Sequence, residues 1–255
     1  MTETFDIIRI KENSKETVKD VVVEEVPLTI MVGEKELVTL LCTPSDLKDL
    51  ATGFLFTSGI IKKGEDIKSI IIDQEHWIAN IVLVNPDIEE KLVFKRLFTS
   101  GCGRGTLFYS AADIIHRKKI VSDFRVAPAR LRSLMLNFQK SSYLFLKTGG
   151  AHSAALAGTE DILIFKEDIG RHNAIDKVIG CALVSVGFKD KILISSGRIS
   201  SEILFKAQKT RIPLLISQSA PTNQAVKLAR DMGLTLVGFA RGSRMNVYSA
   251  EERII

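Results

Sequence analysis

The chain has 255 residues, 45% of them hydrophobic and 25% charged, which suffices for one large domain or for a domain with a smaller lobe. The formal net charge of +5 suits an anionic ligand but comes without a run of lysine and arginine, which argues against a nucleic-acid partner. No apolar run approaches the roughly 18 residues of a membrane span, and residues 1–16 lack a signal-peptide pattern. With three widely spaced cysteines, these features favour a cytoplasmic protein.

Residues 1–97 predict a small α+β lobe. The first 24 residues are polar and charge-rich and indicate an edge strand or a loose lead-in. A helix is expected to begin at Pro44, after Thr43 as its N-cap, and to end at Gly59. The strands of the lobe are expected in two pairs, residues 28–32 with 36–41 and residues 67–72 with 77–84.

Residues 98–255 predict a three-layer α/β domain with a mainly parallel sheet. Three short apolar runs near its end alternate with helical segments, a pattern typical of parallel strands covered on both faces. Ligands of such sheets gather beyond the carboxyl ends of the strands. Helices are expected at residues 106–117, from Pro128, from His172, and at 200–209 and 222–231. Strands are expected at residues 144–147, 154–156, 162–165, 191–195, 213–217 and 235–239.

Cys102 lies in a glycine-rich loop, TSGCGRG at residues 99–105, directly before a segment expected to be helical. The positive end of a helix dipole and the neighbouring Arg104 both favour the thiolate, which is the form that attacks sulfur. The glycines let a bulky partner approach the backbone. The pattern therefore indicates a reactive thiol, with an inert loop cysteine as the alternative. Cys42 and Cys181 are expected to be structural.

A second polar cluster, EDIGRHN at residues 167–173, joins an expected strand to an expected helix. Arg171 and His172 fall at the helix start, where backbone N–H groups favour an anion. His152 follows two glycines and is a further candidate for ligand binding. The alternative for each residue is structural: Asp168 would cap the helix, and each histidine would be hydrogen-bonded in place.

The segment RGSRMN, residues 241–246, ends the last expected strand and carries two arginines beside glycine and serine. Guanidinium groups bind phosphate with two parallel hydrogen bonds, so this is a candidate phosphate site, with a solvated turn as the alternative. No Walker A or G-x-G-x-x-G sequence is present. Cys102, His152 and His172 could imitate zinc ligands, but without C-x-x-C or H-x-E…P-C-x-x-C patterns no metal site is expected.

Seven segments, taken in order, resemble the formate dehydrogenase accessory sulfurtransferase family, also called the FdhD family. They are PSDLKDLATGFLFTSG (44–59), TSGCGRG (99–105), TGGAHSAA (148–155), EDIGRHNAIDKVIG (167–180), SGR (196–198), SAPT (219–222) and LVGFARGSRMNVY (236–248). The resemblance covers nearly the whole chain after residue 25. The segments at 167–180 and 236–248 are long enough to be specific, whereas TGG or SAPT alone would be weak.

The resemblance implies a fold similar to that of cytidine deaminases, an α/β/α layer with an added lobe. It implies a sulfur carrier that takes sulfane sulfur from a cysteine desulfurase as a persulfide on Cys102. The sulfur would pass to bis-molybdopterin guanine dinucleotide, as the catalytic subunit of formate dehydrogenase requires. A second copy of the chain is a further candidate partner. The cofactor-binding residues would be Phe239, Ala240, Arg241, Gly242, Ser243 and Arg244, with His152, Arg171, His172 and Arg198 extending the ligand surface.

Gly105 departs from the C-x-x-C that many relatives carry in this loop. A second thiol there is unavailable, so a relay with one cysteine would need an outside thiol or reductant for the reductive delivery of sulfur. This departure leaves open a second hypothesis, a chaperone that binds the cofactor and the apo-dehydrogenase without moving sulfur. A hydrolytic enzyme of the deaminase type is a third hypothesis, which stoichiometric zinc would favour.

Overall fold

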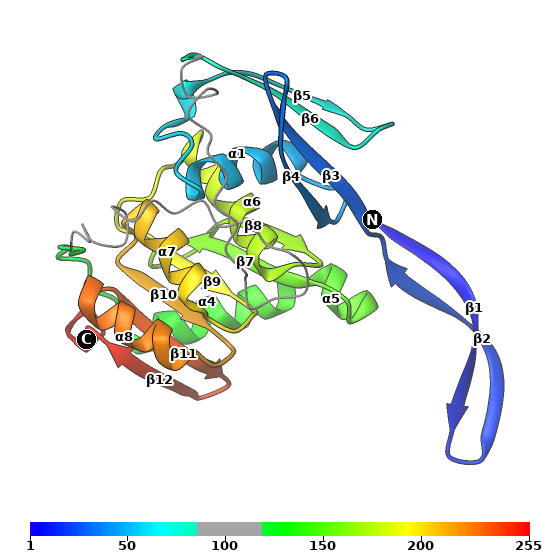
Figure 1. Ribbon diagram of the computed structural model, residues 1–255. Coiled ribbons are helices and arrows are strands. Elements are labelled where there is room, and N and C mark those ends of the chain that lie inside the picture. The colour runs from blue at the N-terminus through cyan, green and yellow to red at the C-terminus, as the bar shows by residue number, and fades with distance from the viewer. Residues whose placement is uncertain (86–118) are drawn as a thin grey trace.

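The computed structural model describes residues 1–85 and 119–255, and within these ranges the strands form three sheets (Figure 1). β1 (Thr2–Lys11) and β2 (Ser14–Val23) pair as an antiparallel ribbon that projects away from the rest of the chain (Figure 1). The expected edge strand or lead-in is therefore a hairpin of two long strands. Both faces of the ribbon are largely exposed, so its sequence lacks the apolar alternation that marks a half-buried strand.

A four-stranded sheet confirms both strand pairs expected in the N-terminal lobe. Its order is β4 (Lys35–Cys42), β3 (Val26–Val32), β6 (Ile78–Leu83) and β5 (Ile67–Asp73), with a 3-10 turn (Gly64–Asp66) before β5. Alternate residues of β3 are buried, as the period of two along a strand requires. β3 and β6 run parallel in the centre, and the two hairpin partners lie at the edges.

Helix α1 (Leu47–Thr57) begins three residues later than expected. Thr43 does not cap it, because its hydroxyl group donates to Asp168 Oδ2 (3.2 Å) and accepts from Lys177 Nζ (2.7 Å). Asp46 is the N-cap instead and adopts a left-handed conformation with φ 53°. The Thr43 hydroxyl therefore makes long-range hydrogen bonds instead of the local cap that the sequence predicted for α1.

The six-stranded sheet is mixed, so the expectation of a mainly parallel sheet is wrong. Only β9, β10 and β11 run parallel, whereas the β11–β12, β9–β7 and β7–β8 pairs are antiparallel. The short connections at residues 158–161 and 242–243 are hairpin turns, which are too short for a parallel crossover. The order is β12 (Arg244–Ser249), β11 (Thr235–Arg241), β10 (Leu214–Ser217), β9 (Ile192–Ser195), β7 (His152–Ala157) and β8 (Ile162–Asp168).

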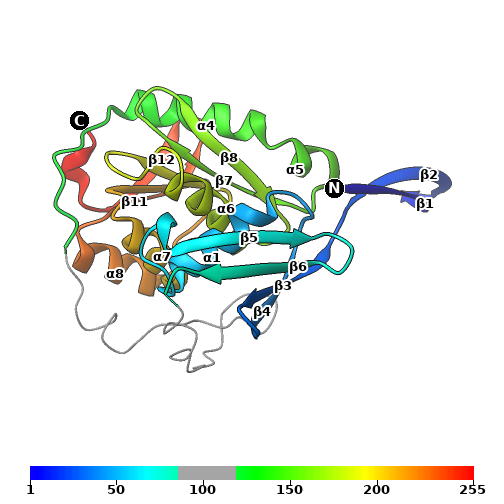
Figure 2. The same ribbon diagram turned by 90° about the horizontal axis from the view of Figure 1, so that it is seen from above.

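Helices cover both faces of this sheet (Figure 2). Residues of one strand alternate between two buried clusters: Leu193 belongs to the cluster with α6 to α8, and Ile192 and Ile194 belong to the cluster with α4. The three-layer arrangement is thus observed, and the likeness to cytidine deaminases stays a prediction. The helices are α4 (Pro128–Ser141) and α5 (Tyr143–Thr148) on one side, and α6 (Arg171–Leu183), α7 (Ser201–Thr210) and α8 (Asn223–Met232) on the other, with a final 3-10 turn (Glu251–Arg253).

The strand expected at residues 144–147 is wrong, because this apolar segment forms helix α5. The carboxylate of Glu167 accepts hydrogen bonds from the backbone N–H groups of Leu144 (3.0 Å) and Phe145 (3.2 Å). It thereby satisfies two donors that the first turn of a helix leaves unpaired. The helix expected at residues 106–117 and the expected domain boundary at residue 97 lie outside the described residues.

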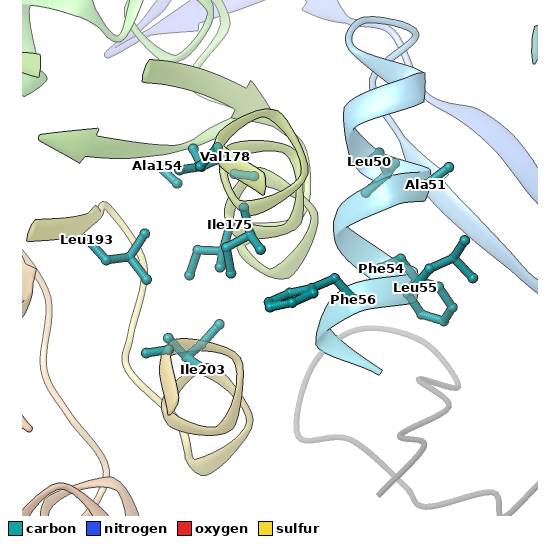
Figure 3. Close-up of a cluster of buried hydrophobic side chains, with 14 of the residues drawn as sticks. Leu50, Ala51, Phe54, Leu55, Phe56, Ala154, Ile175, Val178, Leu193 and Ile203 are labelled. Atoms are coloured by element: carbon teal, nitrogen blue, oxygen red, sulfur yellow. The ribbon is translucent and has the colours of Figure 1, made fainter. Parts of the chain in front are cut away.

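Helix α1 packs directly on α6, and the contact depends on two glycines. A Cβ atom on Gly53 would lie 1.9 Å from the carbonyl oxygen of Asp176, and one on Gly180 would lie 2.0 Å from that of Asp49. Ile175 and other apolar residues of α6 lie between α1 and the strands of the sheet (Figure 3). One buried cluster therefore runs through both predicted domains. Within residues 1–85 and 119–255, none of the helices combines the length and the apolar character needed to cross a bilayer.

We expect Gly180→Ala to lower the free energy of unfolding by about 2 kcal/mol or more, because the added methyl group must push α1 away from α6. Alanine favours a helix over glycine by about 1 kcal/mol, so a loss would isolate the packing effect. Gly158→Ala is the control, since a Cβ there meets nothing within 4 Å. Urea unfolding monitored by circular dichroism measures both variants, and equal stability of the two would contradict the close contact.

Candidate functional site

The loops at the carboxyl ends of β9, β10 and β11 lie side by side at one edge of the sheet. The Ile199 N–H donates to Ala220 O (3.0 Å), and the Phe239 N–H donates to Ser219 O (3.1 Å). The antiparallel β7 brings its first residue to the same edge, where His152 is opposite Asp168 at the end of β8. The candidate residues at the ends of β7, β8, β9 and β11 therefore lie along one edge of the sheet, which is called the rim below.

His152 is held by the loop that follows β9. Its Nδ1 lies 3.1 Å from Ser196 Oγ, which also accepts a hydrogen bond from the Ser153 N–H (3.0 Å). Because that oxygen already accepts, the serine hydroxyl is free to donate to the imidazole. Burial, and to a lesser extent the charge of Arg171, lower the pKa of His152 below its usual value. The side chain is thus a neutral hydrogen-bonding group at neutral pH.

Arg171 lies against the same loop. A Cβ on Gly197 would be 2.8 Å from Arg171 Cδ and 2.9 Å from Arg171 Cβ, so only glycine permits this approach. The next residue, Arg198, is exposed. The segment at residues 196–198 thus packs on the aliphatic part of the Arg171 side chain and exposes the side chain of Arg198 to solvent.

His172 is a neutral histidine packed against an acidic residue of α7. Its Nε2 is buried and lies 3.1 Å from Glu202 Oε2, but the two atoms are not aligned for a hydrogen bond. Burial, with the nearby charges of Lys206 and Arg171, lowers the pKa of His172 to about 2. Burial also raises the pKa of Glu202. The imidazole is therefore uncharged at neutral pH, and the contact is not an ion pair despite the short distance.

Asp168 is the buried centre of the turn that carries Arg171 and His172. Its Oδ1 accepts from the Gly170 N–H (2.9 Å) and from Asn173 Nδ2 (3.0 Å). Its Oδ2 accepts from the backbone N–H of Thr43 (3.1 Å) and pairs with Lys177 Nζ at 2.7 Å, where both side chains are fully buried. The expected capping role of Asp168 is therefore wrong, because the N-cap of α6 is Gly170 and has no side-chain hydrogen bond; Asp168 instead holds the turn before α6 from inside.

A second buried ion pair starts from the neighbouring residue of α6. Asp176 pairs with Lys206 of α7 and accepts a hydrogen bond from the hydroxyl of Thr57 (2.9 Å). Burial raises the pKa of Asp176. Sequence reasoning missed this pair, although the spacing of four residues from His172 to Asp176, and from Glu202 to Lys206, places polar groups on matching helix faces.

The turn between β11 and β12 carries the expected phosphate-binding residues. Arg241 Nε donates to Gln218 O (2.7 Å), and this hydrogen bond holds the Arg241 side chain against the loop after β10. The guanidinium carbon of Arg244, the first residue of β12, lies 5.5 Å from the ring centroid of Phe239 in a cation–π contact. Gly242 and Ser243 are exposed, whereas the side chain of Ala240 is buried and offers a ligand only its backbone.

The two cysteines in the described part of the chain are poor nucleophiles. Burial raises the pKa of Cys42 to about 12, and burial also raises the pKa of Cys181. Both are therefore thiols at neutral pH, as a structural role requires. Cys102 lies outside the described residues. Among the residues that are described, no three His, Cys, Asp or Glu side chains are grouped to hold a metal ion.

Comparison with known proteins gives a consistent set of relatives. The model of the FdhD/NarQ family matches residues 23–255. The sulfur carrier protein FdhD of Bacillus subtilis (strain 168) is 40% identical and covers 100% of this chain and 98% of its own. Its namesake in Bacillus pumilus (strain SAFR-032) is 43% identical and covers 92% of this chain and 90% of its own.

A solved structure has the same fold. It is a crystal structure described as that of a formate dehydrogenase accessory protein from Desulfotalea psychrophila, with a TM-score of 0.83 and 24% sequence identity. The alignment covers 100% of this chain and 99% of the other. The mixed sheet, its helices and the N-terminal lobe thus belong to a fold already observed by crystallography.

We expect Asp168→Asn to lower the free energy of unfolding by about 3 kcal/mol or more, because it leaves the Lys177 ammonium group buried without a counter-charge. Adding Lys177→Met should recover part of the loss, since the double variant removes the unpaired charge. Asp161→Asn, at an exposed position, is the control. Urea unfolding tests the series, and a loss within about 0.5 kcal/mol for the single variant would refute the role of the pair.

His172 should make the protein less stable in acid. Its folded pKa of about 2 lies below the ordinary value of 6.5, so between these values only the unfolded chain binds the proton. The stabilisation is complete above pH 6.5 and is lost as the pH falls. Between about pH 7 and pH 5.5 we expect the wild type to lose about 1 kcal/mol more than His172→Gln. Exposed His76→Gln is the control, and parallel losses in all three proteins would contradict a neutral His172.

Proposed function

Because the chain belongs to the FdhD/NarQ family, we propose that it is a sulfur carrier that holds sulfur as a persulfide on Cys102. The observation that carries this proposal is the match, over nearly full length and at about 40% identity, to relatives named as sulfur carriers. The thiol chemistry supports the choice of residue. Burial raises the pKa of both Cys42 and Cys181, whereas Cys102 has a glycine-rich setting beside Arg104.

The proposed donor is a cysteine desulfurase that carries a persulfide. The Cys102 thiolate attacks the outer sulfur of the donor persulfide, and the S–S bond of the donor breaks. The donor leaves as a cysteine thiolate while the new S–S bond forms on Cys102. The number of electrons is unchanged in this exchange, so the first step needs no oxidant or reductant.

The proposed acceptor is the molybdenum of bis-molybdopterin guanine dinucleotide, a step in the maturation of formate dehydrogenase. Reducing the sulfane sulfur to sulfide takes two electrons and frees the Cys102 thiolate. Two molecules of an outside thiol supply these electrons and leave as a disulfide, because Gly105 provides no second cysteine in the loop. The description of the Desulfotalea psychrophila protein as a formate dehydrogenase accessory protein supports a role in the maturation of that enzyme.

The rim of the sheet has the charge and the hydrogen-bonding groups that an anionic dinucleotide needs. Arg198, Arg241 and Arg244 are exposed at the ends of neighbouring strands, and guanidinium groups bind phosphates with two hydrogen bonds. His152 and His172 have lowered pKa values and would contribute uncharged polar contacts. In this proposal the arginines bind the phosphates and the histidines orient the ligand.

Gly105 favours a second candidate function, in which the protein binds the cofactor and apo-formate dehydrogenase without carrying sulfur. The two functions differ in their dependence on Cys102. A chaperone would tolerate Cys102→Ser and would lose its effect when Arg241 and Arg244 are replaced. A sulfur carrier would lose its effect in both cases.

The test is the mass of the intact protein after incubation with a cysteine desulfurase and cysteine. We expect a gain of one sulfur atom, located by peptide mapping to Cys102 and removed by a reducing thiol. Cys181→Ser is the matched control and should gain sulfur like the wild type, whereas Cys102→Ser should not. Retention of dehydrogenase maturation by Cys102→Ser would favour the chaperone, and a persulfide on Cys181 would contradict the assignment of the thiol.

A further inference from the structure

Three polar groups at the starts of α6 and α7 have no hydrogen-bond partner among the residues that the structure describes. Ser200 is 6% exposed and its Oγ is buried, and the Nε2 of His172 is buried as well. The side chain of Glu202 is 12% exposed, and its contact with His172 Nε2 at 3.1 Å is too poorly aligned for a hydrogen bond. Buried polar groups in folded proteins are almost always paired, so this concentration indicates a ligand that supplies the missing partners.

Ser200 occupies the N-cap position of α7 but does not cap the helix. Its hydroxyl group makes no hydrogen bond to the first turn, whereas the hydroxyl of Thr222 accepts from the Ala225 N–H at the start of α8 (3.2 Å). The first N–H groups of an α-helix have no partner within the helix. The start of α7 therefore offers backbone donors beside an unused hydroxyl group, and Glu202 adds acceptors in the same turn.

Contacts that involve no ligand hold these side chains in place. The Ile199 N–H donates to Ala220 O (3.0 Å), and Ile199 O accepts from the Thr222 N–H (2.9 Å), so the chain just before α7 is tied to the loop after β10. The buried pair of Lys206 with Asp176 fixes α7 against α6. The site is therefore formed before a ligand arrives, as small-molecule sites usually are.

Glu202 is suited to accept two hydrogen bonds from one ligand. An ionised carboxylate has acceptors only, and its two oxygens can bind two parallel N–H groups. Burial raises the pKa of Glu202, and the nearby charges of Lys206 and Arg171 oppose that rise. Two N–H donors from a ligand would stabilise the ionised form further, because hydrogen bonds to a carboxylate favour its charged state.

We propose that this site binds the pterin ring of the cofactor and that Glu202 recognises its amino-substituted edge. The inference rests on the proposed function, since it concerns the same ligand. A pterin presents an oxo group, a ring N–H and an amino group in a row, and its two N–H donors match the oxygens of a carboxylate. The oxo group faces the Ser200 hydroxyl and the N–H groups at the start of α7. Only β10 separates β9 from β11, and neighbouring strands lie about 4.8 Å apart, so the phosphates can still reach Arg241 and Arg244.

The test compares the binding of pterin and lumazine to the full chain by fluorescence titration at neutral pH. Lumazine has an oxo group in place of the amino group, so it turns an acceptor toward Glu202 where pterin turns a donor. We expect the wild type to prefer pterin. Glu202→Gln should weaken pterin binding about tenfold and reduce the preference, because the amide of glutamine also donates. Glu160→Gln is the matched control at an exposed carboxylate that pairs with Arg130, and it should leave both affinities unchanged.

Ser200→Ala provides a second measure of the same site. The hydroxyl group makes no hydrogen bond to the described residues, so the variant should unfold at the same urea concentration as the wild type. It should nevertheless bind pterin about threefold more weakly, because the oxo group loses a donor. A lower unfolding midpoint with unchanged pterin binding would show that the hydroxyl group has a structural task and would overturn its part in the site.

Each contrary outcome separates this inference from the proposed function. Unchanged pterin affinity in Glu202→Gln would overturn the site, and so would equal affinities of the wild type for pterin and lumazine. Guanine shares the edge that pterin presents, so the titration is repeated with excess GDP, and displacement of pterin by GDP would overturn the assignment to the pterin ring. Failure of the wild type to bind pterin would also overturn it, whereas the gain of sulfur on Cys102 tests the proposed function independently.

Discussion

The arrangement of the rim depends on the buried carboxylate of Asp168. It joins three segments of the chain: the residues after β4 through Thr43, the turn after β8 through Gly170, and the middle of α6 through Lys177. A buried charge is stable only when opposite charge and hydrogen bonds surround it, so these segments cannot move apart independently. The turn bearing Arg171 and His172 is therefore held rigidly. The N-terminal lobe helps to fix these two residues through Thr43, although it supplies no candidate residue itself.

Electrostatics divides the rim into buried polar groups and exposed cations. Burial keeps the two histidines uncharged, and the buried carboxylates of Asp168 and Asp176 are paired with Lys177 and Lys206. The exposed arginines of the loops supply the positive charge. In the proposed function, an anionic ligand would meet exposed guanidinium groups first and partly buried neutral imidazoles behind them.

Much of the fold was predictable, and the errors have identifiable causes. Apolar periodicity located both strand pairs of the N-terminal lobe and the helix that begins at Pro128. The strand at residues 144–147 was wrong because Glu167, some twenty residues away, caps a short helix there. The rim residues were predictable as ends of strands, since that rule needs only chain order. Glu202 was missed because its importance comes from its contact with His172 on another helix.

The sequence by itself determined most of the helices and strands, the alternation of their buried faces, and the family of the chain. These features are local, since a few neighbouring residues decide whether a segment is apolar at period two or near 3.6. Tertiary structure alone decided the mixed sheet, the contact of Gly53 and Gly180 between two helices, and the neutral state of His172. Each of these depends on burial or on contacts between residues far apart in the chain, such as Thr43 and Asp168, and no spacing in the sequence encodes them.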